Sequence, residues 1–194
     1  MNKPEGSLKN KCAIISAKPS TNESIVDFLK KAMDKGVFDA VLIPMMVPAG
    51  DSFAYVLIKD KSLLKDAFPL PPIMSVQGGH AISSVTRLGK GNMRIAAIMR
   101  PCEIRAAIEL SKLGQTDLEN ITLISIDCPG VLPLSDFLSD SKKGMKLFDE
   151  AAKKWDDKIM RPVCQICDKS SMVAGDLHIG TLAVSYTHLR AHET

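Results

Sequence analysis

Three successive segments decide the fold class: MRIAAIM (93–99), RPCEIRAAIELSKLG (100–114) and, after a short connection, ITLISI (121–126). The first and third segments are continuous apolar runs of strand length, as is typical of strands buried on both faces of a parallel sheet. Between them, Pro101 suits the first turn of a helix and Gly114 suits its exit. This order of strand, helix and strand predicts a right-handed crossover between parallel strands. We therefore predict an α/β fold with a mainly parallel sheet flanked by helices.

The remaining elements extend this pattern toward both ends of the chain. Ser20 and Glu23 form a capping-box pattern, and the apolar residues after them recur at helical spacing until Gly36. The same reasoning predicts strands at 12–16, 39–44 and 53–59, and helices at 61–67, 80–88 and 141–158.

Two of the five cysteines occupy equivalent positions in the predicted sheet. Cys102 comes directly after the first buried strand, and Cys128 comes directly after the second. Neighbouring strands lie about 4.8 Å apart, so both thiols are expected at one edge of the sheet. Open α/β sheets bind ligands at that edge. Cys102 also opens a helix, where the helix dipole favours a thiolate. The sequence therefore predicts a Cys-rich edge whose thiols are candidate metal ligands.

A further pair of cysteines, Cys164 and Cys167, has C-x2-C spacing. The pair alone is compatible with half a zinc site, a thioredoxin-like redox motif or a cluster-binding hairpin. The chain lacks the second close pair of a zinc finger, and four cysteines without a histidine suit a cluster held by four thiolates. Residue chemistry leaves iron–sulfur, zinc and no metal open. Cys12 opens an apolar run and is interpreted as a structural cysteine.

Composition excludes several classes of protein. The 194 residues include 25 basic and 22 acidic side chains, so the net charge of +3 is too mild to indicate binding to nucleic acid or to a membrane surface. No run reaches the roughly 18 apolar residues of a membrane helix. The N-terminus lacks a signal-peptide core, and an odd number of cysteines argues against a disulfide framework. We expect a cytoplasmic protein with no membrane insertion.

The motifs RPCEIRAAIEL, IDCPG and RPVCQICDKSSMVAGDLHIG, spread over residues 93–182, resemble the coenzyme F420 hydrogenase/dehydrogenase beta-subunit family, which includes formate dehydrogenase beta subunits. The resemblance implies a 4Fe–4S cluster beside a flavin, FAD, with four cluster ligands: Cys102, Cys128, Cys164 and Cys167. It also implies an oxidoreductase subunit that passes electrons between the clusters of partner subunits and a flavin or a deazaflavin acceptor such as coenzyme F420. The alternative is a non-catalytic zinc-binding interaction module in a larger complex.

Two further features are candidates for binding the flavin. Gly78 and Gly79 precede a predicted helix, and their backbone amides suit a pyrophosphate. A plain glycine turn would explain the same residues. Arg100 and Arg105 flank Cys102 and are candidates to hold an anionic cofactor or to offset the charge of a cluster, although both also suit an ordinary surface.

The C-terminal segment VSYTHLRAHET (184–194) differs abruptly in composition from the residues before it. It resembles the translated adapter sequence that contaminates some assembled metagenome sequences. We therefore predict one flavin and iron–sulfur domain over residues 1–183, incomplete at its C-terminus, and a non-native tail over residues 184–194. The tail is expected to pack poorly and to contact no cofactor.

Overall fold

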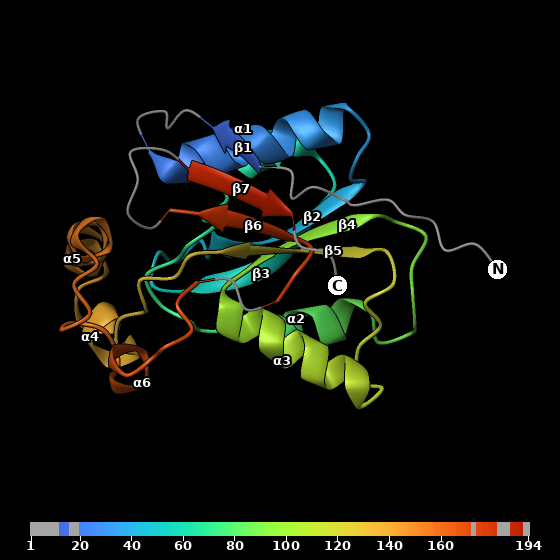
Figure 1. Ribbon diagram of the computed structural model, residues 1–194. Helices are drawn as coiled ribbons and strands as arrows, with labels where there is room; N and C mark the ends of the chain where they lie inside the picture. Colours follow the sequence, from blue (N-terminus) through green and yellow to red (C-terminus); the bar gives the residue numbers. More distant parts are fainter. Residues whose placement is uncertain (1–11, 16–19, 172–173, 182–186, 192–194) are drawn as a thin grey trace.

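The fold is built on a sheet of seven strands in the order β1-β7-β6-β5-β4-β2-β3 (Figure 1). The computed structural model describes residues 12–15, 20–171, 174–181 and 187–191. The strands are β1 (Cys12–Ile15), β2 (Ala40–Met46), β3 (Phe53–Ile58), β4 (Ile95–Met99), β5 (Ile121–Ile126), β6 (Leu177–Gly180) and β7 (Thr187–Ala191). Strands β2, β4, β5 and β6 run parallel to one another, whereas β3, β7 and β1 are attached by antiparallel pairing.

The predicted crossover forms the centre of the sheet. Strands β4 and β5 are adjacent and parallel, with Ile95 opposite Ile121 and Met99 opposite Ser125. Helix α3 (Pro101–Lys112) connects them, with Pro101 in its first turn. All five residues of β4 are buried, as expected for a strand covered on both faces. The predicted α/β class and the parallel pairing are therefore confirmed.

Helices cover both faces of this sheet (Figure 1). Helix α1 (Thr21–Asp34) and the 3-10 helix η1 (Lys61–Asp66) pack on one face around a core that includes Leu29 and Ile98. Helices α2 (Gly78–Val85) and α3 pack on the other face around Ile82 and Ile104. The predicted cap of α1 is present, since the Ser20 side chain accepts a hydrogen bond from the amide of Glu23 at 3.1 Å.

Three more helices form a lobe beside the sheet: α4 (Leu134–Ser139), α5 (Ser141–Lys154) and α6 (Pro162–Gln165). This α4–α6 lobe stands apart from the helices that cover the sheet (Figure 1). It has its own apolar core around Phe137, Phe148 and Met160. The predicted helix at 141–158 ends earlier, at Lys154, because Trp155 adopts a left-handed backbone conformation with φ of 52°. The sequence did not predict α4 or α6.

The C-terminal segment differs from its prediction. Residues Thr187–Ala191 form strand β7, which pairs with β6 on one side and β1 on the other. The backbone of these five residues thus joins the sheet, and the expectation of a poorly packed tail stays a prediction. Residues 184–186 and 192–194 lie outside the described part of the chain, and the non-native origin of the segment stays a prediction. Within the described residues, the helices are all too short or too polar to cross a membrane.

Helices α2 and α3 approach each other closely because α2 begins with two glycines. A side-chain carbon on Gly79 would lie 3.0 Å from the backbone nitrogen of Ala107 and 3.2 Å from the backbone carbonyl carbon of Ala106. A carbon on Gly78 would lie 2.9 Å from the Tyr55 hydroxyl. Gly79 therefore permits the packing of α2 on α3, and Gly78 permits the close approach of Tyr55 from β3.

We expect Gly79→Ala to destabilise the fold by about 1–3 kcal/mol, because α3 backbone atoms cannot move away without disturbing the core. The free energy of unfolding in urea measures the loss. Gly91→Ala is the matched control, since a carbon there would meet its nearest neighbour, the Met93 amide, only at 4.0 Å. Equal stability of the two variants would contradict the packing role of Gly79.

Candidate functional site

The four cysteines singled out in the sequence line one cavity of about 150 Å³. They come from three separate segments: Cys102 from α3, Cys128 from the loop after β5, and the pair Cys164 and Cys167 from α6 and the turn that follows it. Cys102 and Cys167 are exposed, and Cys128 and Cys164 are half-buried. The fold thus brings together thiols that are up to 65 residues apart in the sequence.

Backbone hydrogen bonds hold the three segments in place. The amide of Cys128 donates to the carbonyl of Ser170 at 2.8 Å, which attaches the segment after the C-x2-C pair to the end of β5. The amide of Cys164 donates to the carbonyl of Arg161 at 2.8 Å, and that of Cys167 to the carbonyl of Cys164 at 3.2 Å. These bonds fold the C-x2-C pair into a tight turn facing Cys128.

Asp127, directly before Cys128, also holds together the segments that carry the cysteines. Its buried carboxylate accepts hydrogen bonds from the Ser171 hydroxyl and the Thr181 amide, both at 2.7 Å. Its Oδ1 atom also lies 3.0 Å from Nε2 of His178, which is 5% exposed. Asp127 therefore joins the end of β5, strand β6 and the segment after the C-x2-C pair, and it positions Cys128 through the backbone.

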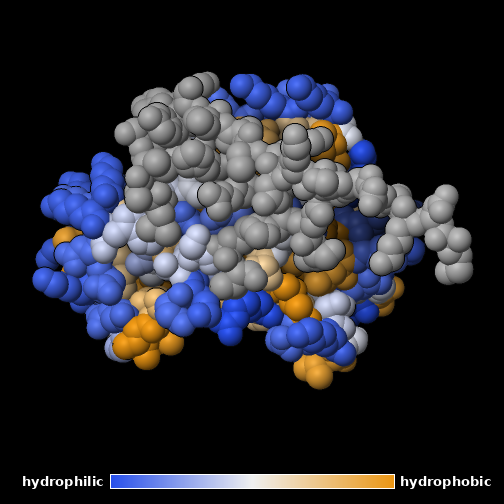
Figure 2. All heavy atoms as spheres, in the orientation of Figure 1, coloured by the Kyte–Doolittle hydropathy of each residue, from blue (hydrophilic) through white to orange (hydrophobic). Residues whose placement is uncertain are grey.

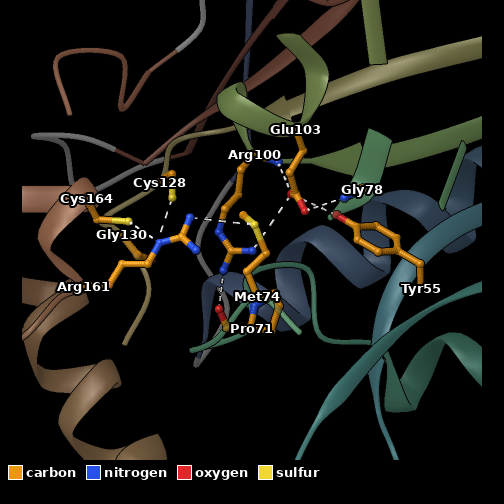
Figure 3. Close-up of polar contacts among 10 residues, drawn as sticks. All are labelled: Tyr55, Pro71, Met74, Gly78, Arg100, Glu103, Cys128, Gly130, Arg161 and Cys164. Atoms are coloured by element: carbon orange, nitrogen blue, oxygen red, sulfur yellow. Dashed lines mark hydrogen bonds and ion pairs between the residues drawn. The ribbon is translucent and has the colours of Figure 1, made fainter. Parts of the chain in front are cut away.

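A second buried carboxylate supports the start of α3. Both oxygens of Glu103 are engaged: Oε1 accepts from the Gly78 amide at 2.9 Å, and Oε2 accepts from the Arg100 amide and the Tyr55 hydroxyl, each at 2.9 Å (Figure 3). Burial, and then the negative charge of Glu103, raise the pKa of Tyr55 well above its usual value, so the phenol is a neutral donor. The Arg100 guanidinium lies 4.0 Å from Oε2 and is buried with it.

The electrostatic environment of the thiols differs from the prediction. Desolvation and the charges of Glu103 and Cys128 raise the pKa of Cys102 to about 11, and Arg100 and Arg161 lower it by less. Desolvation also raises the pKa of Cys128 against the opposing effect of Arg100. The helix dipole at Cys102 therefore does not produce a thiolate in the empty site, because burial outweighs it. Metal binding would have to displace the protons of both thiols.

Two arginines face the cavity, and only one of them was predicted. Arg100 lines it, as expected, whereas Arg105 is exposed on α3 and is not among the lining residues. The second arginine is Arg161, whose Nε donates to Sγ of Cys164 at 3.3 Å (Figure 3). Arg100 and Arg161 each precede a proline that opens a Cys-bearing helix, as R-P-C and R-P-V-C. That repeated Arg-Pro pattern is the signal by which sequence reasoning could have found Arg161.

The predicted flavin residues lie elsewhere. Gly78 and Gly79 are buried between α2 and α3, and the Gly78 amide is already bonded to Glu103. The structure gives the glycine pair a packing role and offers no support for a pyrophosphate at the Gly78 amide. Binding of FAD to this chain stays a prediction.

Single-ion coordination is not preformed at the cysteines. Across the described ranges of the chain, no three His, Cys, Asp or Glu side chains are grouped so that they could hold one metal ion. The cavity nevertheless presents four sulfur donors and no histidine. Ligand sulfurs of a four-iron cluster stand farther apart than those around one ion, because the iron and sulfide of the cluster lie between them. The donor set therefore fits a cluster in its chemistry.

A second, larger cavity of about 430 Å³ adjoins the first. Pro129 and Trp155 line both cavities, so they form the wall between them. The remaining lining residues come from the start of α1, the connector after η1, the ends of β5 and β6, and α5: Ser20, Thr21, Asn22, Phe68, Leu70, Ile126, Phe148, Asp149, Ala152, Lys153 and Thr181. The volume and the apolar walls with a few polar groups are typical of a site for a small organic ligand.

Comparison with known proteins finds similarity both in sequence and in fold. The chain is 28% identical over 111 residues to the F420-dependent formate dehydrogenase 1 subunit beta of Methanococcus maripaludis, a match that covers 57% of this chain and 27% of that protein. Its fold matches a chain of the F420-reducing [NiFe] hydrogenase complex from Methanosarcina barkeri with a TM-score of 0.60 at 11% identity, over 88% of this chain and 68% of that chain. No protein-family model matches the sequence.

Proposed function

We propose that this chain, whose sequence and fold comparisons support membership of the coenzyme F420 hydrogenase/dehydrogenase beta-subunit family, is an electron-transfer subunit of an F420-dependent oxidoreductase. In this proposal, Cys102, Cys128, Cys164 and Cys167 hold a 4Fe–4S cluster, and the larger cavity beside them holds FAD. The match spans about a quarter of the length of the curated relative.

The observation that carries the proposal is the convergence of four thiols on one cavity. They reach it from α3, the end of β5 and the turn after α6, so the arrangement depends on the tertiary fold and not on sequence proximity. A zinc-binding module would need four ligands within about 2.3 Å of one point. Among the described residues no such group is preformed, and the proposal of a cluster rests on the four thiol donors themselves.

The position of the second cavity supports a flavin there. Pro129 and Trp155 line both this cavity and the cavity of the cysteines, so a flavin there would lie close to a cluster, as electron transfer requires. A cluster exchanges single electrons and a flavin can also accept hydride, so the two together couple one-electron and two-electron chemistry. The residues of this chain would contribute binding, exclusion of water by Phe68 and Leu70, and orientation of the ring system beside Trp155.

The surface beside the cysteine cavity supports a partner subunit. Val163 and Ile166, on either side of Cys164, are 58% and 84% exposed. Figure 2 shows a largely hydrophilic surface over the α4–α6 lobe, with hydrophobic atoms gathered at its lower end. Exposed apolar side chains next to a functional cavity are typical of a protein–protein contact. We propose that a subunit of the same redox complex covers this region.

Metal and flavin analysis of the anaerobically purified full chain tests the proposed function. We expect iron and acid-labile sulfide in equal amounts, broad absorption near 400 nm, and bound FAD. A colourless protein with stoichiometric zinc would instead support the interaction module, and a protein without metal would contradict both assignments.

A matched pair of lysine variants tests the flavin site. Lys153 and Lys154 are both exposed, and of the two only Lys153 lines the larger cavity. We expect Lys153→Trp to fill the cavity and weaken flavin binding by about tenfold or more, which corresponds to about 1.4 kcal/mol. Lys154→Trp should bind normally, and iron content should be unchanged in both. Normal FAD titration of Lys153→Trp, followed by flavin fluorescence, would place the flavin elsewhere.

A further inference from the structure

Arg100 and Arg161 bring two positive charges to the cysteine cavity from equivalent positions. Each is the residue immediately before a helix that begins with proline and carries a cysteine in its first turn. Figure 3 shows the two guanidinium groups beside each other, with the sulfurs of Cys128 and Cys164 on one side and Met74 between them. Two like charges held this close favour an anionic occupant of the cavity.

Arg100 is the more deeply buried of the two, with 2% of the residue exposed. Its Nη2 donates to the carbonyl of Pro71, and Glu103 partly balances its charge. Its Nε, in contrast, is buried and has no hydrogen-bond partner in the described structure. A buried donor without a partner costs stability, so its presence beside the cysteine cavity points to a partner that occupies the cavity in the functional protein.

Arg161 is half-buried, and its guanidinium contacts sulfur on two sides. Its Nε donates to Sγ of Cys164 at 3.3 Å, and its Nη2 lies 3.8 Å from Sδ of Met74. Among the ion pairs of the described residues, none includes Arg161. Arginine normally pairs with carboxylate or phosphate through its planar fork of donors. Guanidinium donors directed at sulfur are therefore suited to a negatively charged thiolate.

We propose that Arg161 and Arg100 are positioning residues for the cysteine site: Arg161 donates a hydrogen bond to the Cys164 sulfur and Arg100 places a buried positive charge beside Cys128, and together they stabilise the reduced form of a cluster held by the four thiols. This inference rests on the proposed function. When one electron enters the cluster, its net charge becomes more negative by one and no bond is formed or broken. Nearby positive charge and hydrogen bonds to sulfur stabilise that state and raise the reduction potential.

The experiment compares cluster-loaded full chains by redox titration monitored by electron paramagnetic resonance. We expect Arg161→Gln to shift the midpoint potential to a more negative value while iron per chain stays at the wild-type level. Arg161→Lys keeps the charge but loses the Nε hydrogen bond, so its shift should be smaller. Arg87→Gln is the matched control, because Arg87 is exposed and lines neither cavity, and it should leave the potential unchanged.

The outcomes separate this inference from the proposed function. A wild-type chain without iron would overturn the cluster itself before any variant is made. A loaded Arg161→Gln protein with the wild-type potential, or an equal shift in Arg87→Gln, would overturn the role of the arginines and leave the cluster assignment intact. If Arg161→Gln lost its iron, the cluster-loaded Arg161→Lys protein would test the inference in its place. A wild-type midpoint potential in Arg161→Lys would then contradict the role of the hydrogen bond from Arg161 to Cys164.

Discussion

Iron content is expected to fall sharply when Cys102, Cys128, Cys164 or Cys167 is replaced singly by serine. All four thiols line the same cavity, so each replacement removes one donor from a set of four. A serine hydroxyl is a poor substitute, because iron–sulfur clusters select soft thiolate ligands. Iron and acid-labile sulfide per chain, measured after anaerobic purification, report the loss directly. We expect the largest loss for Cys128, whose position is fixed by backbone bonds on both sides.

Cys12→Ser is the internal control for this series. Cys12 lies on β1, at the edge of the sheet and separated from β5 by β7 and β6, so its replacement should leave iron unchanged. Full iron loading in all four of the other variants would contradict the cluster assignment. If the wild-type chain held zinc in place of iron and the same four variants lost it, the result would support the zinc-binding interaction module instead.

The sequence was sufficient to predict the centre of the fold and the cysteine set. Buried parallel strands produce uninterrupted apolar runs, and their order with Pro101 and Gly114 permits few topologies. Because both Cys102 and Cys128 follow such strands, their convergence could be predicted from topology alone. The approach of the C-x2-C pair could not, since it depends on the path of the chain through the α4–α6 lobe, whose short helices carry weak periodicity.

Two features of the site were ambiguous for a physical reason. A glycine pair at the start of a helix serves equally to bind a phosphate and to let two helices approach closely, and the sequence does not distinguish these two roles; the structure shows the close approach at Gly79, and flavin binding stays a prediction. For a charged residue beside a cysteine, the sequence likewise does not show whether its side chain points into the protein or toward solvent. Arg100 is the N-cap residue before α3 and is buried, whereas Arg105 lies on the exposed face of the helix.

The buried pair of Arg100 and Glu103 was also beyond reach from sequence, although it should be one of the most sensitive points of the fold. Glu103 is 1% exposed and accepts three hydrogen bonds, from the amides of Arg100 and Gly78 and from the hydroxyl of Tyr55. These bonds join α3 to the start of α2 and to β3. Removing the carboxylate would leave all three donors and the buried guanidinium without their partner.

We therefore expect Glu103→Ala to destabilise the metal-free chain by about 3–5 kcal/mol, because breaking a buried pair leaves an uncompensated charge in the interior. Domains of this kind are stable by only about 5–15 kcal/mol, so the variant should be close to unfolding at room temperature. Urea unfolding followed by circular dichroism measures the change. Glu103→Gln keeps the shape of the side chain but not its charge, so its free energy of unfolding should lie between those of wild type and Glu103→Ala. Glu109→Ala, on the exposed side of the same helix, should remain near wild type. A loss at Glu103 no greater than at Glu109 would show that the buried carboxylate contributes little, and that Arg100 is held instead by its bond to the Pro71 carbonyl.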